Sequence, residues 1–177
     1  MALLKPVMIH SSNKEIAVNC ILGIDQSLVE SGVTIKKSTG DYCHFTITPK
    51  KLKGIERLYY IKRKFLTILQ ANQPAFIVME GYSFASKGRG IFDLGELGGV
   101  LKITIYQERI PLYIVEPATL KKFVTGGGKA KKEEMLLKIY KRWGAEFDNN
   151  NLADSFALVK FFENVLTKGT HEQFREK

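Results

Sequence analysis

Residues 18–26, VNCILGIDQ, form a nearly continuous apolar run that reaches the carboxylate of Asp25. Such a run predicts a strand that is buried on both faces of a sheet. Residues 75–80, AFIVME, repeat this pattern and end in Glu80. Ligands gather at the carboxyl ends of the strands in open α/β sheets. If these two strands are parallel neighbours, Asp25 and Glu80 lie side by side at that edge.

Three further segments predict strands around this pair. Residues 31–37 and 42–48 are rich in β-branched and aromatic side chains, with the turn-forming sequence STGD between them. Together with residues 18–26 they predict an antiparallel meander. Residues 112–116 predict a short strand that Pro117 ends. The sheet is therefore expected to be mixed, with antiparallel and parallel strands.

Apolar residues recur at helical spacing in four segments, 55–70, 91–108, 129–143 and 151–166. The order β-β-β-α-β-α-β-α-α predicts an α/β fold with helices on both faces of the sheet. We expect one domain over residues 19–167, preceded by an extension at 1–18 and followed by a tail at 168–177. The helix at 91–108 carries three glycines, which disfavour a helix and so suggest close packing there.

The charge of the chain is uneven. The formal net charge is +9 over 177 residues, and residues 50–64 and 121–142 each contribute +6. Two basic windows in one small domain favour a polyanionic partner such as nucleic acid, although a solvated helix face can also be basic. No segment has the length of a membrane span or the pattern of a secretory signal, so we expect no membrane partner. Cys20 and Cys43 form no ligand cluster and fit a reducing compartment.

A third carboxylate completes a candidate metal site. Asp154 lies in the apolar stretch ADSFAL, and a buried carboxylate must be paired or bind a cation. The apolar runs around Asp25, Glu80 and Asp154 hold no Lys or Arg, so a hard divalent cation such as Mg²⁺ fits better. Two such ions about 4 Å apart activate a water for attack at phosphorus. Taken singly, Asp25 or Asp154 would fit an ordinary turn or capping residue, whereas a lone Glu80 after AFIVM favours neither interpretation.

Four segments carry a resemblance to a known family: ILGIDQS, FIVMEGYSFASKGRG, PATLKKFVTGGGKAKKEEML and LADSFAL. In this order and spacing they resemble the RuvC family of Holliday junction resolvases, over about residues 20–165. The resemblance implies an RNase H-like fold, a homodimer, and Mg²⁺-dependent cleavage of four-way DNA junctions. Two metal ions per site are expected, and Mn²⁺ is expected to be able to substitute for Mg²⁺. The cytoplasm of a bacterial or phage-infected cell is the expected location, and an organelle is an alternative.

The resemblance assigns the acids position by position. Asp25, Glu80 and Asp154 match the metal-binding acids of the family. The fourth ligand of the family falls on Asn151, which brings an amide oxygen without a charge. Asp148 lies about 240° around an ideal helix from Asp154, so it contributes only from a loop before the helix. We favour Asn151 for the fourth position and keep Asp148 open.

The segment GYSFASKGRG, directly after Glu80, is expected to contact DNA. Tyr82 or Phe84 would stack on an unpaired base, and Lys87 and Arg89 would meet phosphates. Alternatively, Phe84 is a core residue that tethers this loop.

A second basic segment offers two further DNA contacts. Lys121 and Lys132 match basic positions that the family uses near the scissile phosphate, or they are plain surface lysines. Gly126, Gly127 and Gly128 lack the strand and the GK[ST] ending of a phosphate-binding loop, so no nucleotide cofactor is expected. They are interpreted as a flexible hinge that lets Lys129, Lys131 and Lys132 adjust to the junction.

Three other functions remain open at this stage. A nuclease of broader specificity for branched DNA or flaps would use the same carboxylates. A junction-binding protein without catalysis is conceivable, because Asn151 replaces an acid. A fragment of an actin-like ATPase would share the first strand, but the chain is too short for the paired domains of that class.

Overall fold

The computed structural model describes residues 20–82 and 90–169. A sheet of five strands forms the centre, in the order β3-β2-β1-β4-β5. The strands are β1 (Ile21–Asp25), β2 (Ser31–Lys36), β3 (Tyr42–Ile47), β4 (Phe76–Glu80) and β5 (Leu112–Val115). The first three strands are antiparallel neighbours, whereas β4 runs parallel to both β1 and β5. The predicted mixed sheet is confirmed, and the predicted extension and most of the tail lie outside the described residues.

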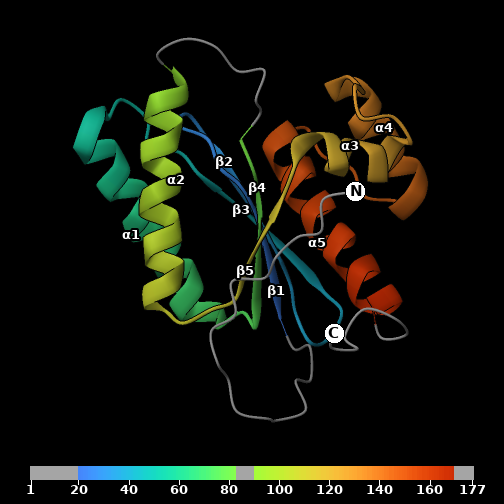
Figure 1. Cartoon of the computed structure of the whole chain (residues 1–177), viewed down its shortest axis with the longest axis horizontal. Coiled ribbons are helices and arrows are strands. Elements are labelled where there is room, and N and C mark those ends of the chain that lie inside the picture. The colour runs from blue at the N-terminus through green and yellow to red at the C-terminus, as the bar shows by residue number, and fades with distance from the viewer. Residues whose placement is uncertain (1–19, 83–89, 170–177) are drawn as a thin grey trace, which may run out of the picture.

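Five helices cover the two faces of the sheet in the part of the chain that the structure describes. They are α1 (Gly54–Asn72), α2 (Gly90–Gln107), α3 (Pro117–Thr125), α4 (Lys132–Trp143) and α5 (Asn150–Gly169). Figure 1 shows α1 and α2 on one side of the sheet, and α3, α4 and α5 on the other. Each side has its own apolar core. Within these residues no helix has the length and apolarity that a membrane crossing requires.

The structure adds one helix that the sequence pattern did not indicate. Pro117 was expected only to end a strand, but it occupies the first turn of α3, where its fixed φ suits a helix and its missing N–H leaves no donor unpaired. Gly126 ends α3 in a left-handed conformation. The next helix, α4, begins at Lys132 and not at residue 129, because the glycine-containing connection intervenes. The lysines expected near DNA therefore come from two separate helices.

Two glycines let α5 lie unusually close to the sheet. A Cβ on Gly23, in β1, would stand 2.2 Å from the backbone oxygen of Ser155. A Cβ on Gly32, in β2, would stand 2.1 Å from the backbone oxygen of Asn151. Real side chains never approach backbone this closely, so only glycine is compatible with this contact. The first two turns of α5 consequently lie against the backbone of β1 and β2.

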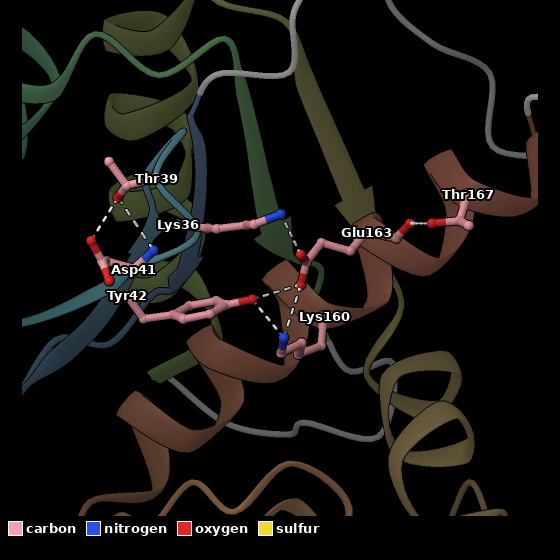
Figure 2. Close-up of polar contacts among 7 residues, drawn as sticks. All are labelled: Lys36, Thr39, Asp41, Tyr42, Lys160, Glu163 and Thr167. Carbon is pink, nitrogen blue, oxygen red and sulfur yellow. Dashed lines mark hydrogen bonds and ion pairs between the residues drawn. The ribbon is translucent and has the colours of Figure 1, made fainter.

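A polar network fixes the other end of α5, as Figure 2 shows. Glu163 forms an ion pair with Lys36 of β2 at 2.6 Å and accepts a hydrogen bond from the Tyr42 hydroxyl at 2.9 Å. Lys160 donates to the same hydroxyl at 2.5 Å and lies 3.2 Å from Glu163. Burial alone would raise the pKa of Glu163, but these donors and the charge of Lys160 hold it below its usual value. The helix that carries Asp154 is thus anchored along its length.

Candidate active site

The register of the sheet places Asp25 and Glu80 next to each other. In the parallel pairing of β1 with β4, Ile24 lies opposite Met79, and each is followed at once by an acid. Side chains alternate between the faces of a sheet. Ile24 and Met79 belong to the core under α1 and α2, so the two acids point toward the opposite face, which α5 covers. The expectation that both carboxylates share the carboxyl edge of the parallel strands is met.

Asp154 enters the same cleft from the first turns of α5. The cleft has a volume of about 280 Å³. Its lining combines the ends of β1 and β4 with Leu94 of α2, with α3 and α4, and with the beginning of α5. The lining residues are Asp25, Gln26, Glu80, Gly81, Leu94, Pro117, Lys121, Lys132, Met135, Asn150, Asn151, Ala153 and Asp154. Three acids that are far apart in the sequence thus share one cavity.

The three carboxylates are crowded and poorly solvated. Asp25 is 8% exposed, and burial, followed by the charges of Glu80 and Asp154, raises its pKa well above the usual range. Burial and the charge of Asp154 raise the pKa of Glu80 to about 7. A hydrogen bond between the side chains of Asp25 and Glu80 favours the protonated form of Asp25. Burial raises the pKa of Asp154 to about 6. Each acid carries an ionisation penalty that nearby positive charge would relieve.

Two lysines supply part of that positive charge. Lys121, from α3, and Lys132, from the first turn of α4, line the cleft and lower the pKa of Glu80 and Asp154. The charge of Lys132 also lowers the pKa of Asp25. Their effect is smaller than that of burial, so the pKa of each acid stays raised. The cleft therefore has more acceptors than its own cations satisfy.

The donor set fits a hard divalent cation. Carboxylate and amide oxygens are the preferred ligands of Mg²⁺ and Ca²⁺, and this cleft offers three carboxylates and three side-chain amides, from Gln26, Asn150 and Asn151. Among the described residues, no group of three or more His, Cys, Asp or Glu side chains is arranged so that it could hold a metal ion by itself. A cation in this cleft would therefore need further oxygen ligands beyond the carboxylates, such as the side-chain amides.

The other residues singled out from the sequence have different positions. Asn151 lines the cleft, whereas Asp148 is exposed and is not part of the lining. Tyr82 is partly buried, with its hydroxyl donating to the carbonyl oxygen of Gly95 at 3.4 Å. Its ring also lies 4.9 Å from the Lys102 ammonium, so Tyr82 is tied to α2. Phe84, Lys87 and Arg89 lie outside the described residues.

Sequence reasoning missed three features of this cleft. Gln26 and Asn150 line it, and each has a buried side-chain oxygen without a hydrogen-bond partner among the described residues. Nothing in the pattern separated Asn150 from its neighbours. The close approach of α5 was also missed, although glycine inside a buried strand, as at Gly23, is a signal for nearby backbone.

The comparisons with known proteins decide the family. The sequence model of the family described as crossover junction endodeoxyribonuclease RuvC matches residues 21–159. The chain belongs to the RuvC family. A RuvC of Thermotoga petrophila is 31% identical over 120 residues, which cover 65% of this chain and 73% of that protein. A RuvC of Chlamydia trachomatis is 29% identical over 150 residues, which cover 78% and 88%. The match to the RuvC of Acidobacterium capsulatum, at 34% identity, spans half of that protein.

Solved RuvC structures share the fold of this chain. Thermus thermophilus RuvC aligns with a TM-score of 0.70 and 20% identity, covering 85% of this chain and 97% of that one. The same protein in complex with a Holliday junction substrate aligns with a TM-score of 0.71. The yeast mitochondrial Holliday junction resolvase aligns with a TM-score of 0.63 and 13% identity, covering 88% and 82%. The RNase H-like architecture expected from the resemblance is confirmed.

Proposed function

We propose that this chain is a Holliday junction resolvase, a metal-dependent endodeoxyribonuclease that cuts opposed strands of four-way DNA junctions. The observation that carries the proposal is the convergence of Asp25, Glu80 and Asp154 with two lysines in one cleft. Membership of the RuvC family, whose description is crossover junction endodeoxyribonuclease, supports this reaction class. A structural neighbour is described as bound to a Holliday junction substrate, which supports the choice of DNA.

Asp25, Glu80 and Asp154 would hold the metal, and an asparagine oxygen at the start of α5 would be a further ligand. The resemblance to the family points to Asn151 for this position. We propose Mg²⁺ as the physiological ion, two ions per site, and Mn²⁺ as a competent substitute. Bound divalent cations supply activation of water and stabilisation of the charge that develops at phosphorus and at the leaving oxygen. The protein's own contribution is to hold its carboxylates fixed on β1, β4 and α5, so that substrate and ligands meet in one geometry.

Lys121 and Lys132 would act on the DNA phosphate. Both residues line the cleft that also contains the three acids, and both belong to the window at 121–142 that is net +6. Their charges would neutralise the approaching phosphate and stabilise the additional negative charge of the transition state. Because α3 and α4 are joined through Gly126, Gly127 and Gly128, the two lysines can adjust separately to the backbone of the junction.

The segment after Glu80 would contact DNA near the crossover. Phe84, Lys87 and Arg89 are proposed to stack on a base and to bind phosphates, as their types and spacing predict. Tyr82 is not proposed to stack on a base, because its hydroxyl and its ring already contact α2. We infer that Tyr82 anchors the start of this segment beside the cleft, which leaves Phe84 as the aromatic residue for stacking.

A second copy of the chain is proposed to pack on α2. Phe92, Ile103 and Tyr106 are large apolar side chains that are 73%, 59% and 67% exposed. A Cβ added to Gly95 or Gly99 would meet no atom within 4 Å. These five positions follow helical spacing and form one open stripe along α2. An isologous contact through this stripe gives a two-fold dimer with two active sites, as paired cleavage of a junction requires.

The test uses a synthetic mobile four-way junction, a flap and a plain duplex, each incubated with the full chain in Mg²⁺ and in EDTA. The expected result is metal-dependent, symmetric nicking of the junction, with little cleavage of the flap and the duplex. Asp25→Asn, Glu80→Gln and Asp154→Asn should each abolish nicking while junction binding survives. Equal cleavage of the flap and the junction would show that the protein is a nuclease of broader specificity for branched DNA and not a resolvase. Binding without cleavage in either Mg²⁺ or Mn²⁺ would leave a non-catalytic junction binder.

A further inference from the structure

Three consecutive asparagines at the start of α5 have three different environments. Asn149 caps the helix, because its Oδ1 accepts the backbone N–H groups of Asn151 at 2.8 Å and Leu152 at 3.2 Å. Its Nδ2 donates to the Glu30 carboxylate. Asn151 donates through Nδ2 to the backbone oxygen of Glu30 at 2.5 Å. Both residues therefore tie the helix to the loop before β2.

Asn150 makes no such contact through its side-chain oxygen. The Oδ1 atom is buried and accepts no hydrogen bond from the described residues. Asn150 lines the cleft of Asp25, Glu80 and Asp154. It precedes Asp154 by four residues, about one helical turn, so both residues lie on the same side of α5. A buried carbonyl oxygen without a donor is unfavourable unless a water or a cation satisfies it.

We propose that Asn150, through Oδ1, is the neutral oxygen ligand that joins the three carboxylates around the cation, and that Asn151 is a positioning residue. This inference rests on the proposed function, because it concerns the metal that the function requires. The chemistry of the cleft supports a cation over a protein donor, since it already holds more acceptors than Lys121 and Lys132 satisfy. An amide oxygen is a suitable ligand for Mg²⁺ and Mn²⁺.

The contacts with Glu30 explain the division of roles between the neighbours. The bond from Asn151 Nδ2 to the Glu30 backbone fixes the amide of Asn151 against β2. The backbone of Asn151 also lies against Gly32, where a Cβ would approach its carbonyl oxygen to 2.1 Å. Asn151 thus sets how closely α5 approaches the sheet. That distance in turn places Asn150 and Asp154 over the cleft.

The experiment measures Mn²⁺ binding by the full chain without DNA. Free Mn²⁺ is followed by electron paramagnetic resonance, and the melting temperature is measured in EDTA. Asn150→Ala should weaken Mn²⁺ binding by about tenfold, the low end of what ligand-sphere substitutions cause, with little change in the metal-free melting temperature. Asn151→Ala should lower the metal-free melting temperature by a few degrees, because a bond between α5 and the sheet is lost, and should retain Mn²⁺ binding within about threefold.

A charged variant adds an independent readout. Asn150→Asp introduces a fourth carboxylate beside three others, so Mn²⁺ binding should tighten while the metal-free protein becomes less stable. If Asn150→Ala binds Mn²⁺ within about twofold of the wild type, the inference is wrong. If only Asn151→Ala loses Mn²⁺ binding, Asn151 is the ligand instead. If Asp154→Asn also left Mn²⁺ binding unchanged, the proposed metal site itself would fail, which is a different result.

Discussion

Removing the charge of Asp154 should stabilise the metal-free protein. The pKa of Asp154 is raised from 3.8 to about 6, chiefly by burial and despite the two lysines nearby. One pKa unit corresponds to about 1.4 kcal/mol, so ionisation of this carboxylate costs the folded state about 3 kcal/mol. Asp154→Asn has the same shape and no charge. For a chain of this size we expect its melting temperature in EDTA at pH 8 to exceed that of the wild type by about 6–12 °C.

The sign of the effect fixes its pH dependence. Because the folded-state pKa lies above that of the unfolded chain, the penalty is fully present above about pH 7. It declines as the pH falls through about 6 and is absent below the unfolded value near 3.8. The difference between Asp154→Asn and the wild type should therefore disappear toward pH 4. Adding Mn²⁺ at pH 8 should reverse the order, since the cation compensates the carboxylate only in the wild type.

Thermal melts by circular dichroism between pH 4 and pH 8, in EDTA and in Mn²⁺, give these values. Asp148→Asn is the matched control, because it removes an exposed carboxylate six residues earlier and should change the melting temperature by no more than about 2 °C. A melting temperature of Asp154→Asn at or below that of the wild type in EDTA at pH 8 would rule out the ionisation penalty. That result would mean that the carboxylate is satisfied within the protein and needs no cation.

Three further outcomes are expected. Glu163→Gln should lower the free energy of unfolding by about 1–2 kcal/mol at pH 7. Because the folded-state pKa of Glu163 is lowered, this loss should shrink as the pH falls below the ordinary carboxyl range and vanish once Glu163 is protonated in the folded protein; melts that differ equally at all pH values would contradict this. Lys132→Ala should slow single-turnover junction cleavage by about a hundredfold while binding weakens much less, and an unchanged rate would remove Lys132 from the site. Gly99→Leu should convert the dimer to a folded monomer in sedimentation equilibrium, because the position is open within one chain and would clash across the two-fold contact; a persisting dimer would move the interface away from α2.

The sequence by itself determined the chemistry and most of the framework. Two apolar runs ending in Asp25 and Glu80 predicted strands buried on both faces of the sheet, because such strands lack the alternation of half-buried ones. These runs alone leave open whether the two strands are parallel neighbours. A carboxylate within an apolar helix, at Asp154, predicted a third member of the site. The strands and the shared cleft could be predicted because hydrophobic periodicity and burial cost are local properties of the chain, whereas metal binding by the three acids stays a prediction.

Tertiary structure decided how these parts meet. Three adjacent asparagines are chemically alike. Only their contacts with Glu30 distinguish Asn149 and Asn151 from Asn150, which lines the cleft without such a contact. The distance between α5 and the sheet depends on Gly23 and Gly32, whose backbone contacts come from residues more than a hundred positions away. Composition and spacing contain no record of such long-range contacts, because they arise only when the helix packs on the sheet.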